Sequence, residues 1–96
     1  MRLFSRFKHR SMADADEERK RILRVHGRIT DGRVVDTYYG PNGEEIAVYV
    51  YTLNGVDFES SEILNEDQLR DPIKYAPGAK VAIRYDPKRH GNSLLV

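Results

Sequence analysis

The stretch Ile46–Phe58, IAVYVYTLNGVDF, decides how the rest of this chain folds. β-branched residues alternate here with mostly aromatic ones, and this period of two predicts a strand with apolar side chains on both faces. Asn54-Gly55 follows at once, and this dipeptide favours the positive φ angles of a type I′ turn. The alternation resumes at Val56, so we predict a β-hairpin whose two faces both need cover. The two alternating sets are Ile46, Val48 and Val50 on one face, and Ala47, Tyr49 and Tyr51 on the other.

Length and composition limit the number of domains and the chemistry that the chain can carry out. With 96 residues, the chain has room for one domain and one hydrophobic core. It contains no cysteine, which excludes disulfides and thiolate chemistry. No apolar run approaches the roughly 20 residues that span a bilayer, and no signal-peptide pattern follows the basic start. We therefore expect a cytoplasmic protein, with peripheral contact to the inner membrane left open.

The charge is distributed unevenly, although the formal net charge is only +1. Residues 1–28 contain nine basic and four acidic side chains, which gives that segment +5 and leaves −4 for the rest. A basic arm on an acidic body suits phosphate-rich surfaces or acidic partner proteins. An acidic body resists wrapping in nucleic acid.

The first ten residues, MRLFSRFKHR, interleave apolar and basic side chains and contain no acid. On a helix, Leu3, Phe4 and Phe7 fall on one side. Such an arm suits a membrane surface, a partner protein or nucleic acid, whereas the plain alternative is a disordered start. The candidate partner-binding residues of the arm are Arg2, Phe4, Arg6, Phe7, Lys8 and Arg10.

A short, solvated helix is predicted next, from about Met12 to Lys20. Ser11 and Asp14 have the spacing of a capping box, and acidic residues precede basic ones, which suits the helix dipole. The expected i, i+4 ion pairs are Asp16 with Lys20 and Glu17 with Arg21. The chain therefore divides into a basic arm with a short charged helix over residues 1–21 and a β-barrel domain over residues 22–96.

From Ile22 the period changes to two, which predicts a strand with Leu23 and Val25 on one face. Asp31-Gly32 interrupts this strand. Either one long strand bends at its glycines, or Asp31-Gly32 turns a tight hairpin. The turn chemistry slightly favours a hairpin or a sharp bulge.

Local signals in the second half are clearer. Gly40–Gly43 is a turn, and Asn65 with Gln68 forms the capping box of a short helix. Pro77-Gly78 specifies a type II turn. Strands are expected over residues 80–85 and 93–96. The succession predicts a mainly β fold: a small five- or six-stranded barrel, OB-like or SH3-like, with one short helix between strands and a short N-terminal helix.

Residues 27–95 resemble an uncharacterised bacterial domain-of-unknown-function family of small β domains that are often attached to membrane helices. The resemblance lies in the segments GRVV (32–35), YVYTLNGVDF (49–58), YAPGAKVAIRYDP (75–87) and SLL (93–95). The chain departs from that pattern by lacking a membrane helix and by having Gly91 where a second proline is usual. The resemblance implies a small β fold and no known catalytic residues.

Few residues suggest catalysis or metal binding. His9, His26 and His90 are far apart in sequence and lack the spacing of metal ligands, so we expect no metal, no cofactor and no enzymatic activity. Asp57, Glu59 and Glu62 alternate along a strand, as a solvated face or a surface for a basic partner would.

Tyr49 and Tyr51 are further partner-binding candidates, because an exposed tyrosine pair can stack bases on an OB-like barrel. The acids around the hairpin oppose a phosphate backbone, so the tyrosines fit packing or a protein contact better. The leading hypothesis is a non-enzymatic interaction module or accessory subunit that docks on a protein partner or complex, with its basic arm helping. The alternative is an OB-like binder of single-stranded nucleic acid that uses Tyr49, Tyr51, Arg24 and Arg28.

Overall fold

A mainly β fold follows a single long helix. The computed structural model describes the backbone of residues 2–96, and side chains from Asp14 onward. Helix α1 (Arg2–His26) comes first, and the short helix α2 (Glu66–Leu69) lies between the third and fourth strands. The strands are β1 (Arg28–Tyr39), β2 (Glu45–Leu53), β3 (Val56–Ile63), β4 (Lys80–Asp86) and β5 (Arg89–Leu95). The predicted fold class is confirmed.

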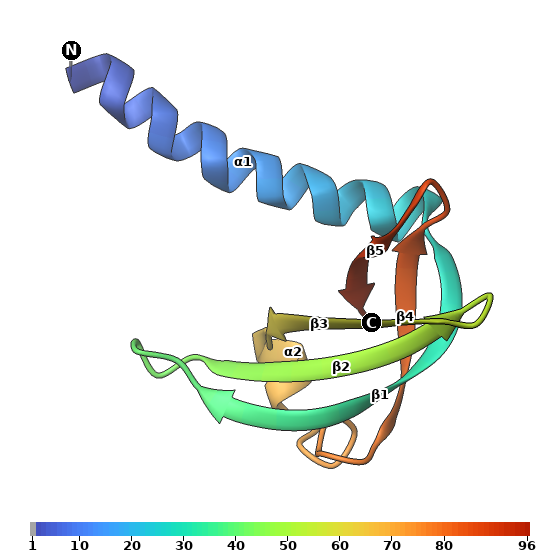
Figure 1. Cartoon of the computed structure of the whole chain (residues 1–96). Coiled ribbons are helices and arrows are strands. Elements are labelled where there is room, and N and C mark those ends of the chain that lie inside the picture. Colours follow the sequence, from blue (N-terminus) through green and yellow to red (C-terminus); the bar gives the residue numbers. More distant parts are fainter. Residues whose placement is uncertain (1) are drawn as a thin grey trace.

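The five strands form one antiparallel sheet in the order β3-β2-β1-β4-β5. The sheet curls until its two outer strands, β3 and β5, approach each other, which gives a nearly closed barrel (Figure 1). The order of strands and the position of α2 between β3 and β4 match the OB-like alternative.

The hairpin of β2 and β3 has the predicted turn. Leu53 pairs with Val56, and the two residues between them have φ angles of 52° for Asn54 and 80° for Gly55. Both angles are positive, as a type I′ turn requires. The strand directs its aromatic set inward, where Tyr49 is fully buried, and its β-branched set outward.

Strand β1 is continuous, so the hairpin favoured at Asp31-Gly32 is wrong and the long bent strand is right. Gly32 lies where β1 passes close to its neighbours: a Cβ there would come within 2.7 Å of both the Ile83 side chain and the Val50 carbonyl oxygen. Glycine therefore permits close approach here rather than a reversal of the chain. The predicted bulge occurs further on, because the register with β2 shifts between Val34 and Asp36.

The strand predicted from Ile22 is also wrong, because α1 continues to His26. The cause is tertiary: Leu23 is only 1% exposed, and α1 contacts the sheet at β4 and β5. The Gly27 amide donates to the Leu23 carbonyl at 2.9 Å and closes the last helical turn. Burial of Leu23 and this hydrogen bond outweigh the alternating pattern of the sequence.

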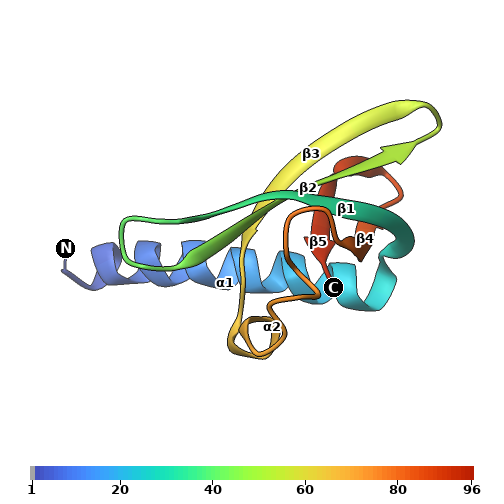
Figure 2. The ribbon, with the colours of Figure 1, turned by 90° about the horizontal axis from the view of Figure 1, so that it is seen from below.

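The predicted helix at 12–20 exists, but it is part of the longer α1. Ser11 is inside α1 and therefore does not cap it. The Asp16–Lys20 ion pair is present at 3.4 Å, whereas Arg21 pairs with Glu18 at 2.6 Å instead of with Glu17. The helix crosses the barrel at its C-terminal end and projects beyond it over its N-terminal part (Figures 1 and 2). No helix in the described part of the chain is long and apolar enough to cross a membrane.

Turns and caps in the second half agree with the sequence. The Asn65 side chain accepts the Gln68 amide at 2.8 Å, and the Gln68 side chain accepts the Asn65 amide at 2.9 Å. The type II turn is confirmed by a φ of 92° at Gly78. Strand β5 begins at Arg89, four residues before the start that was predicted.

Candidate interaction surface

The outward side of the β1–β2–β3 sheet carries a cluster of apolar residues. The strand register pairs Tyr38 with Ile46 and Ile46 with Ile63, so these three side chains form one row across three strands. Directly opposed residues in a sheet have Cβ atoms about 5 Å apart. Tyr38 is 48% exposed and Ile63 is 55% exposed. The row is therefore continuous and open to solvent.

Two further rows extend this surface along β2. Val48 and Val50 point to the same side as Ile46 and are half-buried between their cross-strand neighbours. We call this surface the outer β face and define it by Tyr38, Ile46, Val48, Val50 and Ile63. The outer β face arises from the alternating pattern of β2. This strand has apolar side chains on both faces, and the barrel interior buries only one of them.

Charged residues flank the outer β face, and most are acidic. Asp36 pairs with Val48, and Glu59 pairs with Val50, so both carboxylates lie beside the apolar centre. Asp57 is one step further along β3 and accepts the Thr52 hydroxyl at 2.6 Å. Two basic residues lie on the β1 side: Arg33 is opposite Val50, and Lys80 of β4 is paired with Arg33. The flanks are therefore net negative.

The described part of the chain contains no helix that covers the outer β face. The contacts of α1 with the sheet are at β4 and β5, and α2 follows the end of β3 (Figure 1). A face of this kind in a small protein exposes apolar surface that a binding partner can bury.

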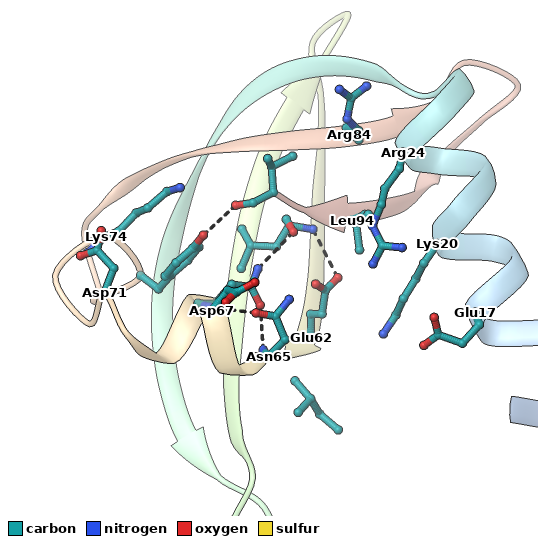
Figure 3. A pocket seen from close by; sticks show the side chains of 15 residues that line it. Glu17, Lys20, Arg24, Glu62, Asn65, Asp67, Asp71, Lys74, Arg84 and Leu94 are labelled. Atoms are coloured by element: carbon teal, nitrogen blue, oxygen red, sulfur yellow. Dashed lines mark hydrogen bonds between the residues drawn. The ribbon is translucent and has the colours of Figure 1, made fainter.

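A cleft of about 670 Å³ lies between α1, α2 and the ends of β3 and β5, and it adjoins the outer β face at Ile63. Lys20 and Arg24 extend into it from α1, Arg84 lies on β4, and Glu62 is at its centre (Figure 3). The α2 side carries Asp67, Asp71 and Lys74. The cleft is thus polar and contains charges of both signs.

Glu62 is tied to the barrel rather than free in the cleft. Its Oε1 accepts the Leu95 amide at 3.3 Å, and the Gln68 side chain donates to the Leu95 carbonyl at 3.3 Å. Burial raises the pKa of Glu62, and the Leu95 hydrogen bond together with Lys20 and other cations of α1 opposes this rise. These side chains join β5 to β3 and α2 where the two strands are not paired.

More side chains connect the unpaired edges of β3 and β5, which we call the seam of the barrel. Arg19 of α1 donates to the Ser93 carbonyl at 3.1 Å, and the Tyr49 hydroxyl lies 2.7 Å from Ser93 Oγ. The Tyr51 hydroxyl donates to the His90 carbonyl at 2.5 Å. The polar groups at this seam therefore have structural partners.

The structure excludes the exposed tyrosine pair considered as a partner-binding site and agrees with the packing role that the sequence favoured. Tyr49 is 0% exposed and Tyr51 is 3% exposed, and their rings stack in the core with centroids 6.1 Å apart. The two residues lie on the inward face of β2, and their hydroxyls have partners across the barrel. The core contains Val34, Ala47, Tyr49, Tyr51, Leu64, Tyr75, Val81, Ile83 and Leu95.

Of the other sequence candidates, the arm residues have side chains outside the described part of the chain. They are Arg2, Phe4, Arg6, Phe7, Lys8 and Arg10. His26 ends α1, and His90 packs edge-on against Phe58 and Tyr85. From Asp14 onward, no group of histidines and carboxylates is placed to hold a metal ion. Sequence reasoning expected docking by a strand face or edge but did not name the residues of the outer β face, although the alternation along β2 was their signal.

The comparisons with known proteins identify a family and no activity. Residues 24–96 match the family described as Domain of unknown function (DUF3592), and the chain belongs to that family. Neither a curated protein nor a solved structure matches the chain. The predicted resemblance to an uncharacterised family of small domains is therefore confirmed.

Proposed function

We propose that this member of the DUF3592 family is a non-enzymatic interaction module that docks on a partner protein through its outer β face. The supporting observation is the continuous apolar row of Tyr38, Ile46 and Ile63, in which Tyr38 and Ile63 are exposed, Ile46 is half-buried, and no helix of the described chain covers the row. Protein interfaces have apolar centres enriched in aromatic residues and polar rims. The outer β face has that arrangement, with Asp36 and Glu59 at its rim.

Rigid support favours this role. The side chains behind the face are buried, so β2 presents Ile46, Val48 and Val50 from a packed core. A preorganised surface loses little conformational entropy on binding. The basic arm adds electrostatic attraction to an acidic partner or to an anionic membrane surface beside it.

Two observations count against the nucleic-acid alternative. Its stacking residues, Tyr49 and Tyr51, are in the core, and the rim of the outer β face is net negative. Single-strand binding surfaces need exposed rings and a positive groove.

Partner capture from the native host tests the proposal. A tagged full-length chain is compared with an Ile46→Thr/Val48→Thr variant, which keeps β-branched side chains in the strand but removes apolar surface. Val56→Thr is the matched control, because Val56 is 54% exposed but lies at the hairpin tip. We expect the double variant to lose a protein that the control retains, with both variants folded by circular dichroism.

Equal recovery of the same protein by the double variant would contradict docking through the outer β face. Salt-sensitive binding of oligonucleotides that Ile46→Thr/Val48→Thr abolishes would also contradict it, since the face would then bind nucleic acid.

A further inference from the structure

The rim of the outer β face restricts what can bind there. Asp57 and Glu59 lie next to each other on the outward side of β3, and Asp36 lies on β1. Arg33 and its neighbour Lys80 on β4 carry the opposing charge, so the three carboxylates leave the rim with a small negative excess. An occupant that buries Ile46 and Val48 must therefore bring apolar side chains together with positive charge to meet this rim.

One segment of this same chain has that chemistry. Residues 2–10, RLFSRFKHR, contain Leu3, Phe4 and Phe7 with four Lys and Arg residues and no acid. Charge is also separated at the level of the whole chain, because residues 1–28 carry +5 and the remainder carries −4. The segment and the outer β face are thus complementary in both apolar content and charge.

The segment does not reach the outer β face of its own chain. Helix α1 is held to β4 and β5 at its C-terminal end by Leu23 and Arg19. From Asp14 the helix runs on to Arg2, a further length of about 18 Å at 1.5 Å per residue. Figure 1 shows this part standing clear of β1 and β2. Any such contact must therefore form between two molecules.

We propose that the outer β face binds residues 2–10 of a second copy of this chain. The inference rests on the proposed function, since it names the occupant of the same face. Two copies that each insert their basic segment against the other's face make two equivalent contacts, which is the arrangement of a closed, two-fold dimer.

Sedimentation of the full chain over a range of concentrations tests this, with charge exchange as the key comparison. Asp57→Lys/Glu59→Lys reverses the rim, and Arg6→Glu/Lys8→Glu reverses the arm. We expect each double variant alone to weaken self-association roughly tenfold or more, and a mixture of the two to associate again. Glu66→Lys, an exposed acid on α2, is the control and leaves association unchanged.

A peptide of residues 2–10 is the direct probe. It should bind the wild-type chain by fluorescence anisotropy, bind more weakly as salt rises, and not bind Ile46→Thr/Val48→Thr. A chain that stays monomeric at every concentration, while the peptide binds anionic phosphatidylserine vesicles instead, would overturn the inference.

The two proposals fail in different ways. If the wild-type chain is monomeric but Ile46→Thr/Val48→Thr still loses a captured partner, the proposed binding of a second copy is wrong. Docking of a partner protein through the outer β face then stands. If self-association survives Ile46→Thr/Val48→Thr and the reversed rim, the second copy does not occupy this face and the inference is overturned.

Discussion

The Leu95 amide donates to Oε1 of Glu62 at 3.3 Å, across the seam where the order of strands leaves β3 and β5 unpaired. A side chain on β3 thus takes the role that a backbone carbonyl has within a sheet. A titratable group thus takes part in closing the barrel, and we expect stability to depend on its protonation.

Stability should fall as pH rises through the titration of Glu62. Burial raises the pKa of Glu62 above its ordinary 4.5, so the folded state binds this proton more tightly than the unfolded state does. The contribution of Glu62 to the free energy of unfolding therefore decreases from about pH 4.5 up through the raised pKa and is constant above it.

Glu62→Gln isolates this effect, because glutamine retains an oxygen for the Leu95 amide but does not titrate. Urea unfolding of both proteins at several pH values gives the difference in free energy of unfolding. We expect wild type minus Glu62→Gln to become less favourable as pH rises through that window. A difference that grows with pH would show that the cations of α1 outweigh burial.

The hydroxyl of Tyr49 should matter even though its ring supplies most of the packing. Tyr49→Phe leaves the buried Ser93 hydroxyl without its partner at 2.7 Å, which costs about 1–3 kcal/mol. Ser93→Ala alone removes the same hydrogen bond from the Tyr49 hydroxyl, which still has Ser60 nearby. The double variant should be less destabilised than the sum of the two, and equilibrium denaturation measures that coupling. Strict additivity would indicate that the two hydroxyls do not interact.

Local chemistry explains which parts of this fold were predictable. The Asn54-Gly55 turn and the cap of Asn65 with Gln68 depend on residues within a few positions, so the sequence is sufficient for them. The orientation of β2 could not be predicted from local sequence, because both of its faces are apolar. Partners of Tyr49 and Tyr51 on β5, about 40 residues later, decide which face is inside.

The same distinction accounts for the two errors at the start of the barrel. Leu23 fits a strand or a helix by local pattern, and only its burial against the barrel selects the helix. The Asp31-Gly32 dipeptide fits a turn by composition. In the folded chain, however, glycine is needed at position 32 because Ile83 and Val50 lie too close for a Cβ atom. The residues of the outer β face were not predicted as a site for a related reason. The inward orientation of Tyr49 must be known before the opposite side of β2 can be identified as exposed.

Gly32→Ala should destabilise the barrel. A Cβ at this position would meet the Val50 carbonyl oxygen at 2.7 Å, and backbone on two strands must shift to admit it. We expect a loss of about 1–3 kcal/mol in the free energy of unfolding. Gly91→Ala is the matched control, because its nearest neighbour is the Phe58 ring at 3.8 Å, an ordinary contact. Equal effects of the two substitutions would argue against close approach at Gly32.

The attachment of α1 should depend on a single apolar side chain. Leu23→Ala removes the buried residue at the crossing with β4 and β5, and large-to-small substitutions of this kind cost about 2–5 kcal/mol. Arg19 keeps its hydrogen bonds to Asn92 and Ser93 at the edge of the same contact, so we expect the lower part of that range.

Val25→Ala is the control for the helix, because Val25 is 62% exposed and such substitutions change stability by at most about 0.5 kcal/mol. Hydrogen exchange of the α1 amides distinguishes local release from global unfolding. In Leu23→Ala, we expect faster exchange in α1 while the amides of β1 and β2 remain protected, because the barrel core does not include Leu23. Equal acceleration in helix and barrel would mean that α1 and the sheet unfold as one unit. Unchanged protection in α1 would mean that Leu23 does not hold the helix, and that Arg19 and its partners on β5 are sufficient.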